Sequence, residues 1–283
     1  MTTTQRAPTR VISFPSPSRY AVPALSRTLV RTLATLTGAV VAIVAVWTLF
    51  IRLVDVSSFV AKSPLDVWNY LFTDAGASTH RAEIASRLVR TLTDASYGFV
   101  LGLALAASVS LLFYFSRIAE SMFIPSVTVL HAIPMVTIAP ILVLIFGRGA
   151  AGTAVIGAAI VFVPALLTML QGIRSTPRAD IDMVTAYGGS TLSKFWKAAL
   201  PHAIPTWFTA ARIAVTTSVV GALLAEWLAT GLGLGGQMLK DANEFEFARL
   251  WSSVVILTIT TIVSYHIVSV IESAVTAHMT AAR

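Results

Sequence analysis

The amino-acid sequence predicts an all-α integral membrane protein with about six transmembrane helices. Of its 283 residues, 56% are hydrophobic and 12% are charged, and the mean hydropathy is +0.80. A soluble domain carries roughly 25% charged residues. The charges are also clustered, so that five long stretches contain no Asp, Glu, Lys or Arg, namely residues 32–51, 95–116, 121–147, 149–173 and 250–271.

Each of these stretches is long enough to cross a membrane as a helix. About 20 apolar residues that rise 1.5 Å each span the hydrocarbon core, whereas a strand of a membrane barrel needs only about 10. A sixth apolar stretch, residues 203–230, is interrupted only by Arg212 and Glu226. We therefore predict six spans, in the order in which these stretches occur.

The short segments between the spans predict the orientation. The residues ahead of the first span contain five arginines and no acidic residue, which places the N-terminus in the cytoplasm. Six crossings then place the C-terminus and the basic 174–200 loop on the cytoplasmic side. The segments 52–86 and 231–249, which hold most of the acidic residues, fall outside. The expected location is the bacterial cytoplasmic (inner) membrane, as a multi-pass protein.

The expected organisation follows the same pattern. Residues 1–28, rich in Ser, Thr, Pro and Arg, are expected to be a disordered basic cytoplasmic segment. Residues 29–63 hold the first span and the start of an outer loop, 64–272 form the core, and 273–283 form a cytoplasmic tail. The net charge of +7 is explained by topogenic arginines and by attraction to membrane lipid, so no nucleic-acid partner is expected.

Several motifs that would indicate chemistry are absent or out of context. Residues 147–152 and 231–236 fit G-x-G-x-x-G but lie at predicted helix ends, without the βαβ unit that a dinucleotide site needs. The sequence contains no P-loop motif, no H-E-x-x-H and no cysteine, which excludes thiolate metal sites and disulfides. No bound cofactor, metal or catalytic residue is expected. Gly98-x-x-x-Gly102 predicts a close helix contact within the subunit.

The 174–200 loop is the most informative segment of the chain. Residues 179–187 are compatible with a short helix, Gly188-Gly189 predicts a tight corner, and Ser190 can cap a second helix. In that second helix one apolar stripe is predicted, formed by Leu192, Phe195, Trp196, Ala199 and Leu200. An interfacial helix that lies on the membrane would explain the second half. It would not explain the first half, which suits a short helix that projects into a groove on a partner.

This loop resembles the E-A-A-x-x-x-G-x(9)-I-x-L-P signature of permease subunits of ABC importers. Asp182, Met183 and Val184 occupy the first three positions, Gly188 the glycine, and Leu200-Pro201 the end, with the spacing kept throughout. Asp replaces Glu, Met-Val replaces Ala-Ala, and Ala198 stands at the Ile position. Further similarities to the nitrate/sulfonate/taurine-type branch lie in residues 86–90, 131–134, 139–140, 146–147, 225–226 and 231–233.

The resemblance, which covers roughly residues 64–272, implies a type I ABC importer permease fold. It implies two permease subunits, with a homodimer expected and a heterodimer left open, and cytoplasmic ABC ATPase subunits that bind ATP and Mg²⁺. It also implies an extracytoplasmic solute-binding protein. The residues expected to couple to the ATPase are Asp182, Met183, Val184, Tyr187, Gly188, Gly189, Lys194, Leu200 and Pro201.

Residues inside the bilayer supply candidates for the solute pathway or its gate. His131, Pro134 and Met135 lie in a span that two prolines should bend, and broken helices often line a pathway. The alternative for these residues, which we favour, is ordinary packing. Glu226 is a candidate because a charge in a span is costly. The alternative for Glu226, which we favour, is a structural hydrogen bond to backbone around residues 231–236. Arg212, about 21 Å from it along the helix, is expected to snorkel or to support the coupling loop.

The resemblance implies a small organic or inorganic anion as solute, such as a sulfonate, taurine or nitrate. Aromatic acids or a pyrimidine precursor remain open. Two other classes of function are weighed: a self-contained secondary transporter or channel, which would leave the 174–200 loop unused, and a polytopic membrane enzyme. The enzyme would rely on residues such as Asp94 and His266, but no nucleophile elbow or metal spacing supports it.

Overall fold

The computed structural model describes residues 21–54 and 57–281, with side chains described for residues 38–54 and 57–279. The chain divides into two units, residues 1–57 and 58–283. The first unit contains α1 (Ala21–Val54), which begins ahead of the expected boundary at residue 29. The expected disorder of residues 1–20 lies outside the described residues and stays a prediction.

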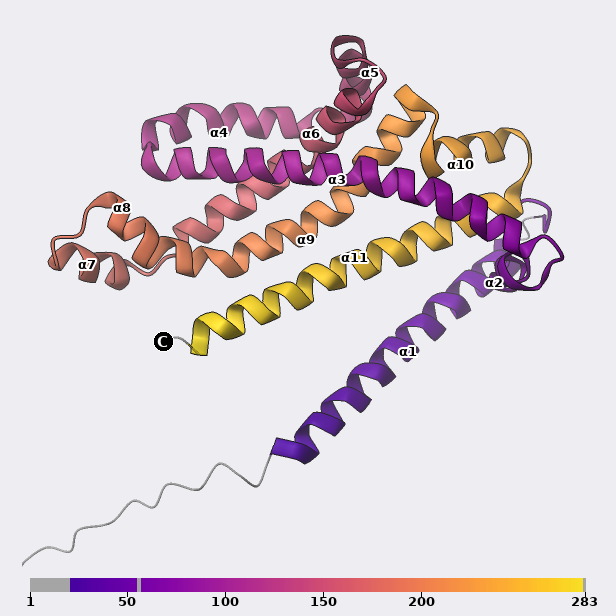
Figure 1. The fold of residues 1–283 in the computed structure, drawn as a ribbon, viewed down its shortest axis with the longest axis horizontal. Helices are drawn as coiled ribbons and strands as arrows, with labels where there is room; N and C mark the ends of the chain where they lie inside the picture. The colour runs from indigo at the N-terminus through magenta and orange to yellow at the C-terminus, as the bar shows by residue number, and fades with distance from the viewer. Residues whose placement is uncertain (1–20, 55–56, 282–283) are drawn as a thin grey trace, which may run out of the picture. The chain divides into compact units, whose positions relative to one another are not determined.

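The second unit is built from helices laid side by side (Figure 1). Short helices occupy its two ends. α7 and α8 lie at the end where the chain finishes, and α2 and α10 lie at the opposite end. The elements in order are α2 (Pro64–Trp68), η1 (Asn69–Thr73), α3 (Ala77–Phe115), α4 (Arg117–Ala132), α5 (Met135–Phe146), α6 (Ala150–Arg174), α7 (Arg178–Ala186), α8 (Thr191–Lys194), η2 (Phe195–Ala199), α9 (Leu200–Ala225), η3 (Glu226–Thr230), α10 (Gly233–Asn243) and α11 (Phe247–Ala281).

This arrangement agrees with part of the predicted topology. The 174–200 loop and the end of α11 share one end of the unit, while the segment 231–249 occupies the other. Residues 273–281 are the last turns of α11 rather than a separate tail.

The described helices include four that can each cross a membrane alone, α3, α6, α11 and the helical run 191–230. The predicted third span is a pair of helices, α4 and α5, bent by 103° at Ile133–Pro134. Pro134 has no N–H to continue the α4 ladder, and Ile133 is extended because it precedes a proline. The bend falls here and not at Pro140, which lies within α5.

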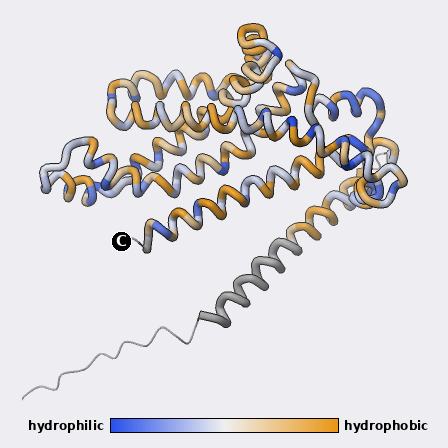
Figure 2. The backbone as a smooth tube through the Cα atoms, in the orientation of Figure 1, coloured by the Kyte–Doolittle hydropathy of each residue, from blue (hydrophilic) through white to orange (hydrophobic). Residues whose placement is uncertain are grey.

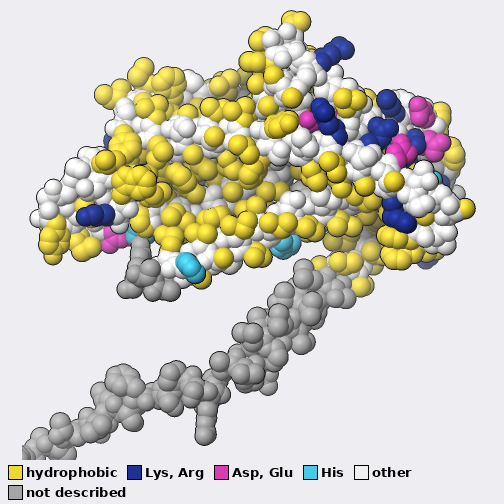
Figure 3. All heavy atoms as spheres, in the orientation of Figure 1, with side chains coloured by type: hydrophobic (Ala, Val, Ile, Leu, Met, Phe, Trp, Pro, Cys, Tyr) yellow, Lys and Arg dark blue, Asp and Glu magenta, His cyan; other side chains and the backbone are white. Residues whose placement is uncertain are grey.

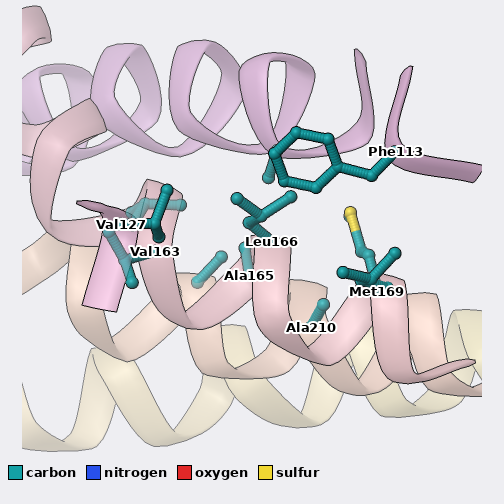
Figure 4. Packing of buried hydrophobic residues seen from close by; sticks show 11 residues of the cluster. Phe113, Val127, Val163, Ala165, Leu166, Met169 and Ala210 are labelled. Carbon is teal, nitrogen blue, oxygen red and sulfur yellow. The ribbon is translucent and has the colours of Figure 1, made fainter. Parts of the chain in front are cut away.

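α6 is the centre of the bundle. In its most apolar 18-residue window 56% of the residues are buried, compared with 6% for α11, so α6 is packed by neighbours and α11 is peripheral. The main core joins α6 to α3, α4 and α9 (Figure 4). Phe113, Val127, Leu166 and Ala210 each bring one of these helices into that cluster.

Three glycines let α3, α6 and α9 approach one another at backbone distance. A Cβ atom built on Gly98 would lie 2.7 Å from the Gly157 Cα, and one built on Gly221 would lie 2.7 Å from the same atom. One turn along α3, a Cβ on Gly102 would lie 2.6 Å from the Val161 Cβ. The predicted close contact of Gly98-x-x-x-Gly102 within the subunit is therefore confirmed.

Apolar and charged residues separate along the length of the unit. The long helices are hydrophobic over most of their length, whereas α10 is hydrophilic (Figure 2). On the face shown in Figure 3, charged side chains gather at the α2 and α10 end. Arg249 donates to the Asp241 Oδ1 there and lies 3.7 Å from Glu83, which ties α11 to α10 and α3. Desolvation raises the pKa of Asp241, although Gln237 and Arg249 donate hydrogen bonds to it.

We expect Gly98→Ala to lower stability by about 1–3 kcal/mol, because the added methyl group must push α3 away from the α6 backbone. Thermal unfolding of the detergent-solubilised chain measures the change. Gly149→Ala is the control, since a Cβ there meets nothing within 4 Å. Equal melting temperatures for the two variants would contradict the close approach.

Candidate coupling and pathway sites

The first half of the 174–200 loop is the helix α7, which ends in a tight glycine corner. The Gly189 N–H donates to the Val184 carbonyl and the Gly188 N–H to the Thr185 carbonyl, both at 2.9 Å. These two bonds form a Schellman motif, in which Gly188 takes the left-handed position with φ of 73°. A Cβ on Gly189 would lie 2.7 Å from the Val184 carbonyl oxygen. Both glycines are therefore required by the corner.

The base of the loop is fixed to the bundle at two points. The Asp180 Oδ2 lies 2.6 Å from the His202 Nε2, which joins the first turn of α7 to the first turn of α9. Phe195 is buried against Ile173 of α6, and its ring lies 5.2 Å from that of Tyr114. α7 is thus held by side chains of the long helices at its base.

Two apolar side chains that were predicted to contact the ATPase, those of Met183 and Tyr187, face away from the protein. Tyr187 is 89% exposed and Met183 57% exposed, and Asp182 lies beside them on the surface. Val184 is half-buried behind Gly189. Two exposed apolar side chains at the tip of a polar loop form a surface that a partner protein can cover.

The second half of the loop agrees with the expectation at its cap and differs from it in the apolar stripe. Ser190 caps α8 as predicted, accepting from the Ser193 N–H at 3.3 Å. The helix then continues through η2 into α9 without a break at Pro201, because a proline in the first turn of a helix needs no N–H donor. The predicted single stripe is wrong, since Phe195 and Ala199 are buried while Leu192 and Trp196 are exposed. Lys194, Leu200 and Pro201 are half-buried along this run.

The bend between α4 and α5 opens a cavity of about 430 Å³. His131, Pro134 and Met135 all line it, and α6 closes it with Ile160 and neighbouring residues. His131 is the one titratable side chain among its described lining residues, and the others are apolar. The structure therefore brings three of the four candidate pathway residues together, while Glu226 is not part of this lining.

Glu226 instead fastens the 231–236 loop to the end of α9. Its side chain is fully buried, and its Oε2 accepts the Gly235 N–H at 2.6 Å. Trp227 donates to the Gly235 carbonyl at 2.8 Å, so both backbone groups of Gly235 bond to η3. A Cβ on Gly235 would lie 2.7 Å from the carboxylate. The expected bond to the 231–236 backbone is confirmed.

α3 contributes to the same junction through Thr91. The Leu234 N–H donates to the Thr91 Oγ1 at 2.8 Å, inside the protein. One turn further along α3, the buried Asp94 accepts from Arg90 at 3.1 Å. Asp94 lies in the middle of α3, not at a helix start.

Two ion pairs join residues that are far apart in sequence and could not be predicted from it. Arg212 of α9 pairs with Glu272 of α11, whereas the sequence predicted that Arg212 snorkels or supports the coupling loop. Glu120 of α4 pairs with Arg174 at the end of α6. The partners are 60 and 54 residues apart in sequence, and only the packing of the helices brings them together. Within the described residues no group of three or more His, Cys, Asp or Glu side chains could hold a metal ion.

Comparison with known families identifies this arrangement. Residues 98–280 match the family described as the binding-protein-dependent transport system inner membrane component. The chain belongs to this family. It is a multi-pass membrane permease of an ABC importer.

Individual relatives agree with this assignment. A probable ABC transporter permease of Haemophilus influenzae is 30% identical over 75% of this chain and 84% of its own length. A formylaminopyrimidine transport permease of Halalkalibacterium halodurans is 27% identical over 66% of this chain and 75% of its own. A putative aliphatic sulfonates transport permease of Bacillus subtilis is 24% identical over 77% of each chain.

A solved structure supports the fold. The crystal structure of an amino acid ABC transporter with histidines aligns with a TM-score of 0.54 at 14% identity. The alignment covers 73% of this permease and all of that chain. At this identity the likeness concerns the fold alone.

We expect Glu226→Ala to destabilise the permease by about 1–3 kcal/mol, because it leaves the buried Gly235 N–H without an acceptor. Glu226→Gln retains an acceptor oxygen and should be nearly as stable as the wild type. Thermal unfolding of both variants in detergent distinguishes them. A gating role would give another pattern, in which Glu226→Gln unfolds normally but transports poorly.

Proposed function

We propose that α7, with the corner at Gly188, is the coupling helix that docks into a groove on a cytoplasmic ABC ATPase. The observation that carries the proposal is the contrast between tip and base. Tyr187 and Met183 are exposed at the tip, while Asp180 and Phe195 fix the base to the bundle. A partner that covers the tip would bury apolar surface that no described part of this chain covers.

The transport cycle follows from this attachment. ATP and Mg²⁺ bind to the ATPase subunits, whose closure brings the two coupling helices of a permease pair together. Because each α7 is fixed to α6 and α9, the spans move with it from an inward-open to an outward-open state. ATP hydrolysis resets the pair, so that the ATPase supplies energy to a two-state element in the permease.

The remaining partners are proposed on the family assignment. Importers of this family work with a solute-binding protein, which would dock at the end that carries α2 and α10. A second copy of this chain is the proposed second permease subunit. The cytoplasmic side is assigned to the end that carries α7.

We further propose that the α4–α5 cavity lies on the solute pathway and that the solute is a small anion such as a sulfonate, taurine or nitrate. The relative from Bacillus subtilis supports this class by its name. His131 would be the group of this chain that meets the anion. A pyrimidine is a second candidate, favoured by the apolar lining of the cavity and by the name of the Halalkalibacterium relative.

The coupling proposal predicts that Met183→Ser/Tyr187→Ser weakens association with the ATPase roughly tenfold to a hundredfold, because buried apolar anchors carry most of an interface's binding energy. A pull-down of the tagged permease from its native membrane, followed by mass spectrometry, measures the ATPase retained. The side chains are exposed, so the variant should fold normally.

Leu239→Ser is the matched control, since Leu239 is 50% exposed on α10 at the opposite end. Gly188→Trp should also release the ATPase, because tryptophan is strained at a φ of 73° and occupies the docking surface. Full ATPase retention by both coupling variants would refute the proposal. Transport in vesicles without ATP would restore the secondary-transporter alternative.

The pathway proposal predicts that His131→Ala lowers anion uptake roughly tenfold to a hundredfold, the range expected for a lost hydrogen bond to a charged group. Uptake of taurine and of a formylaminopyrimidine, each delivered by its binding protein to the reconstituted importer, provides the measurement. Unchanged taurine uptake together with efficient pyrimidine uptake would favour the second candidate. His266→Ala, which makes the same substitution in α11 outside this cavity, is the control.

A further inference from the structure

A second, basic cavity lies beside the 174–200 loop, here called the coupling segment, and is not used by the proposed transport cycle. It measures about 470 Å³ and is formed where α3, α4, α6 and α7 meet. Three guanidinium groups line it, those of Arg117, Arg174 and Arg178, together with the hydroxyl-bearing Tyr114 and Thr176. Its one acidic lining residue is Glu120.

The charges in this cavity are not balanced. Glu120 is engaged by Arg174, so its negative charge is already matched. Arg117 and Arg178 form no hydrogen bond or ion pair with any described residue. Two arginines that line one cavity without an acidic partner suit an anion with several acceptor oxygens, above all a phosphate.

A neighbouring groove distinguishes between a soluble phosphate and a lipid. A second hollow of about 580 Å³ shares Arg117, Glu120 and Arg174 with the basic cavity and continues along α4. Ile118, Ile124 and Pro125 line this continuation, and Ile118 is 74% exposed. The polar cavity is therefore joined to an apolar surface on a membrane-embedded helix, where an acyl chain can lie.

We propose that this pair of cavities binds one anionic phospholipid of the leaflet on the coupling-segment side. The phosphate lies between Arg117 and Arg178, and an acyl chain follows α4 past Ile118. A soluble phosphate would make no use of the apolar groove, and a zwitterionic headgroup would bring a cation towards two unmatched arginines. Because Ile181 of α7 lines the same cavity, the bound headgroup touches the coupling helix.

Native mass spectrometry of the full-length permease tests the proposal. The detergent-solubilised chain is titrated with dioleoyl phosphatidylglycerol and, in parallel, with dioleoyl phosphatidylcholine. We expect one phosphatidylglycerol to bind tightly per chain. Arg117→Gln/Arg178→Gln should weaken this binding roughly thirtyfold, at about 1 kcal/mol for each lost basic residue.

The controls separate this site from general charge effects and from misfolding. Arg148→Gln/Lys240→Gln removes the same charge away from the cavity, in the turn before α6 and in α10, and should bind as the wild type does. Arg117→Lys/Arg178→Lys keeps the charge and should retain binding to within a few fold. Elution of all variants as the same species on size exclusion shows that they fold.

Three results would overturn the proposal. The first is equal binding of the two lipids by the wild type. The second is an equal loss of binding in the two charge-removing variants. The third is displacement of the bound phosphatidylglycerol by millimolar inorganic phosphate, which would assign the cavity to a soluble anion.

Discussion

The close approach of three helices at Gly98, Gly157 and Gly221 is the constraint on which the rest of this permease depends. At this point α3, α6 and α9 touch through backbone atoms, with no side chain between them. These helices carry both the Glu226 contact and the base of α7. Gly221 lies about five residues, or about 7.5 Å, before Glu226, and α6 runs on from Gly157 to Ile173 at the base of the coupling segment. The junction therefore fixes where the Glu226–Gly235 contact and the Phe195–Ile173 contact stand relative to each other.

Much of this architecture was accessible from local sequence signals. The charge-free stretches located the long helices, the spacing of Gly98 and Gly102 indicated a close contact, and Gly188 marked a left-handed corner. Features set by packing were not accessible. The pairing of Arg212 with Glu272 depends on the docking of α11 against α9. The exposure of Trp196 depends on which face of the run 191–230 the bundle covers, and helical periodicity alone does not give that face.

Carboxylates within the long helices are stabilised by hydrogen bonds or ion pairs with other groups of this chain. The Glu226 carboxylate accepts a backbone N–H, Asp94 pairs with Arg90, and the half-buried Glu272 pairs with Arg212. Each is fixed in place by a partner of this chain and lies outside the α4–α5 cavity. His131 is then the one titratable group of the described chain that faces this space. In the proposed solute pathway, selection by charge within this chain would therefore fall to His131.

The way in which α7 is attached determines what it can transmit. A nine-residue helix is only marginally stable by itself in water. The Schellman corner closes its far end, and Asp180 with His202 fastens its near end to α9. The buried Phe195 then joins that base to α6 through Ile173. A force applied at Tyr187 is thus shared by α6 and α9 at once. Because these two helices meet backbone to backbone at Gly157 and Gly221, they cannot slide apart by side-chain rearrangement there. In the proposed coupling, a movement of α7 would therefore turn the two helices as one body and carry the Glu226–Gly235 contact with them.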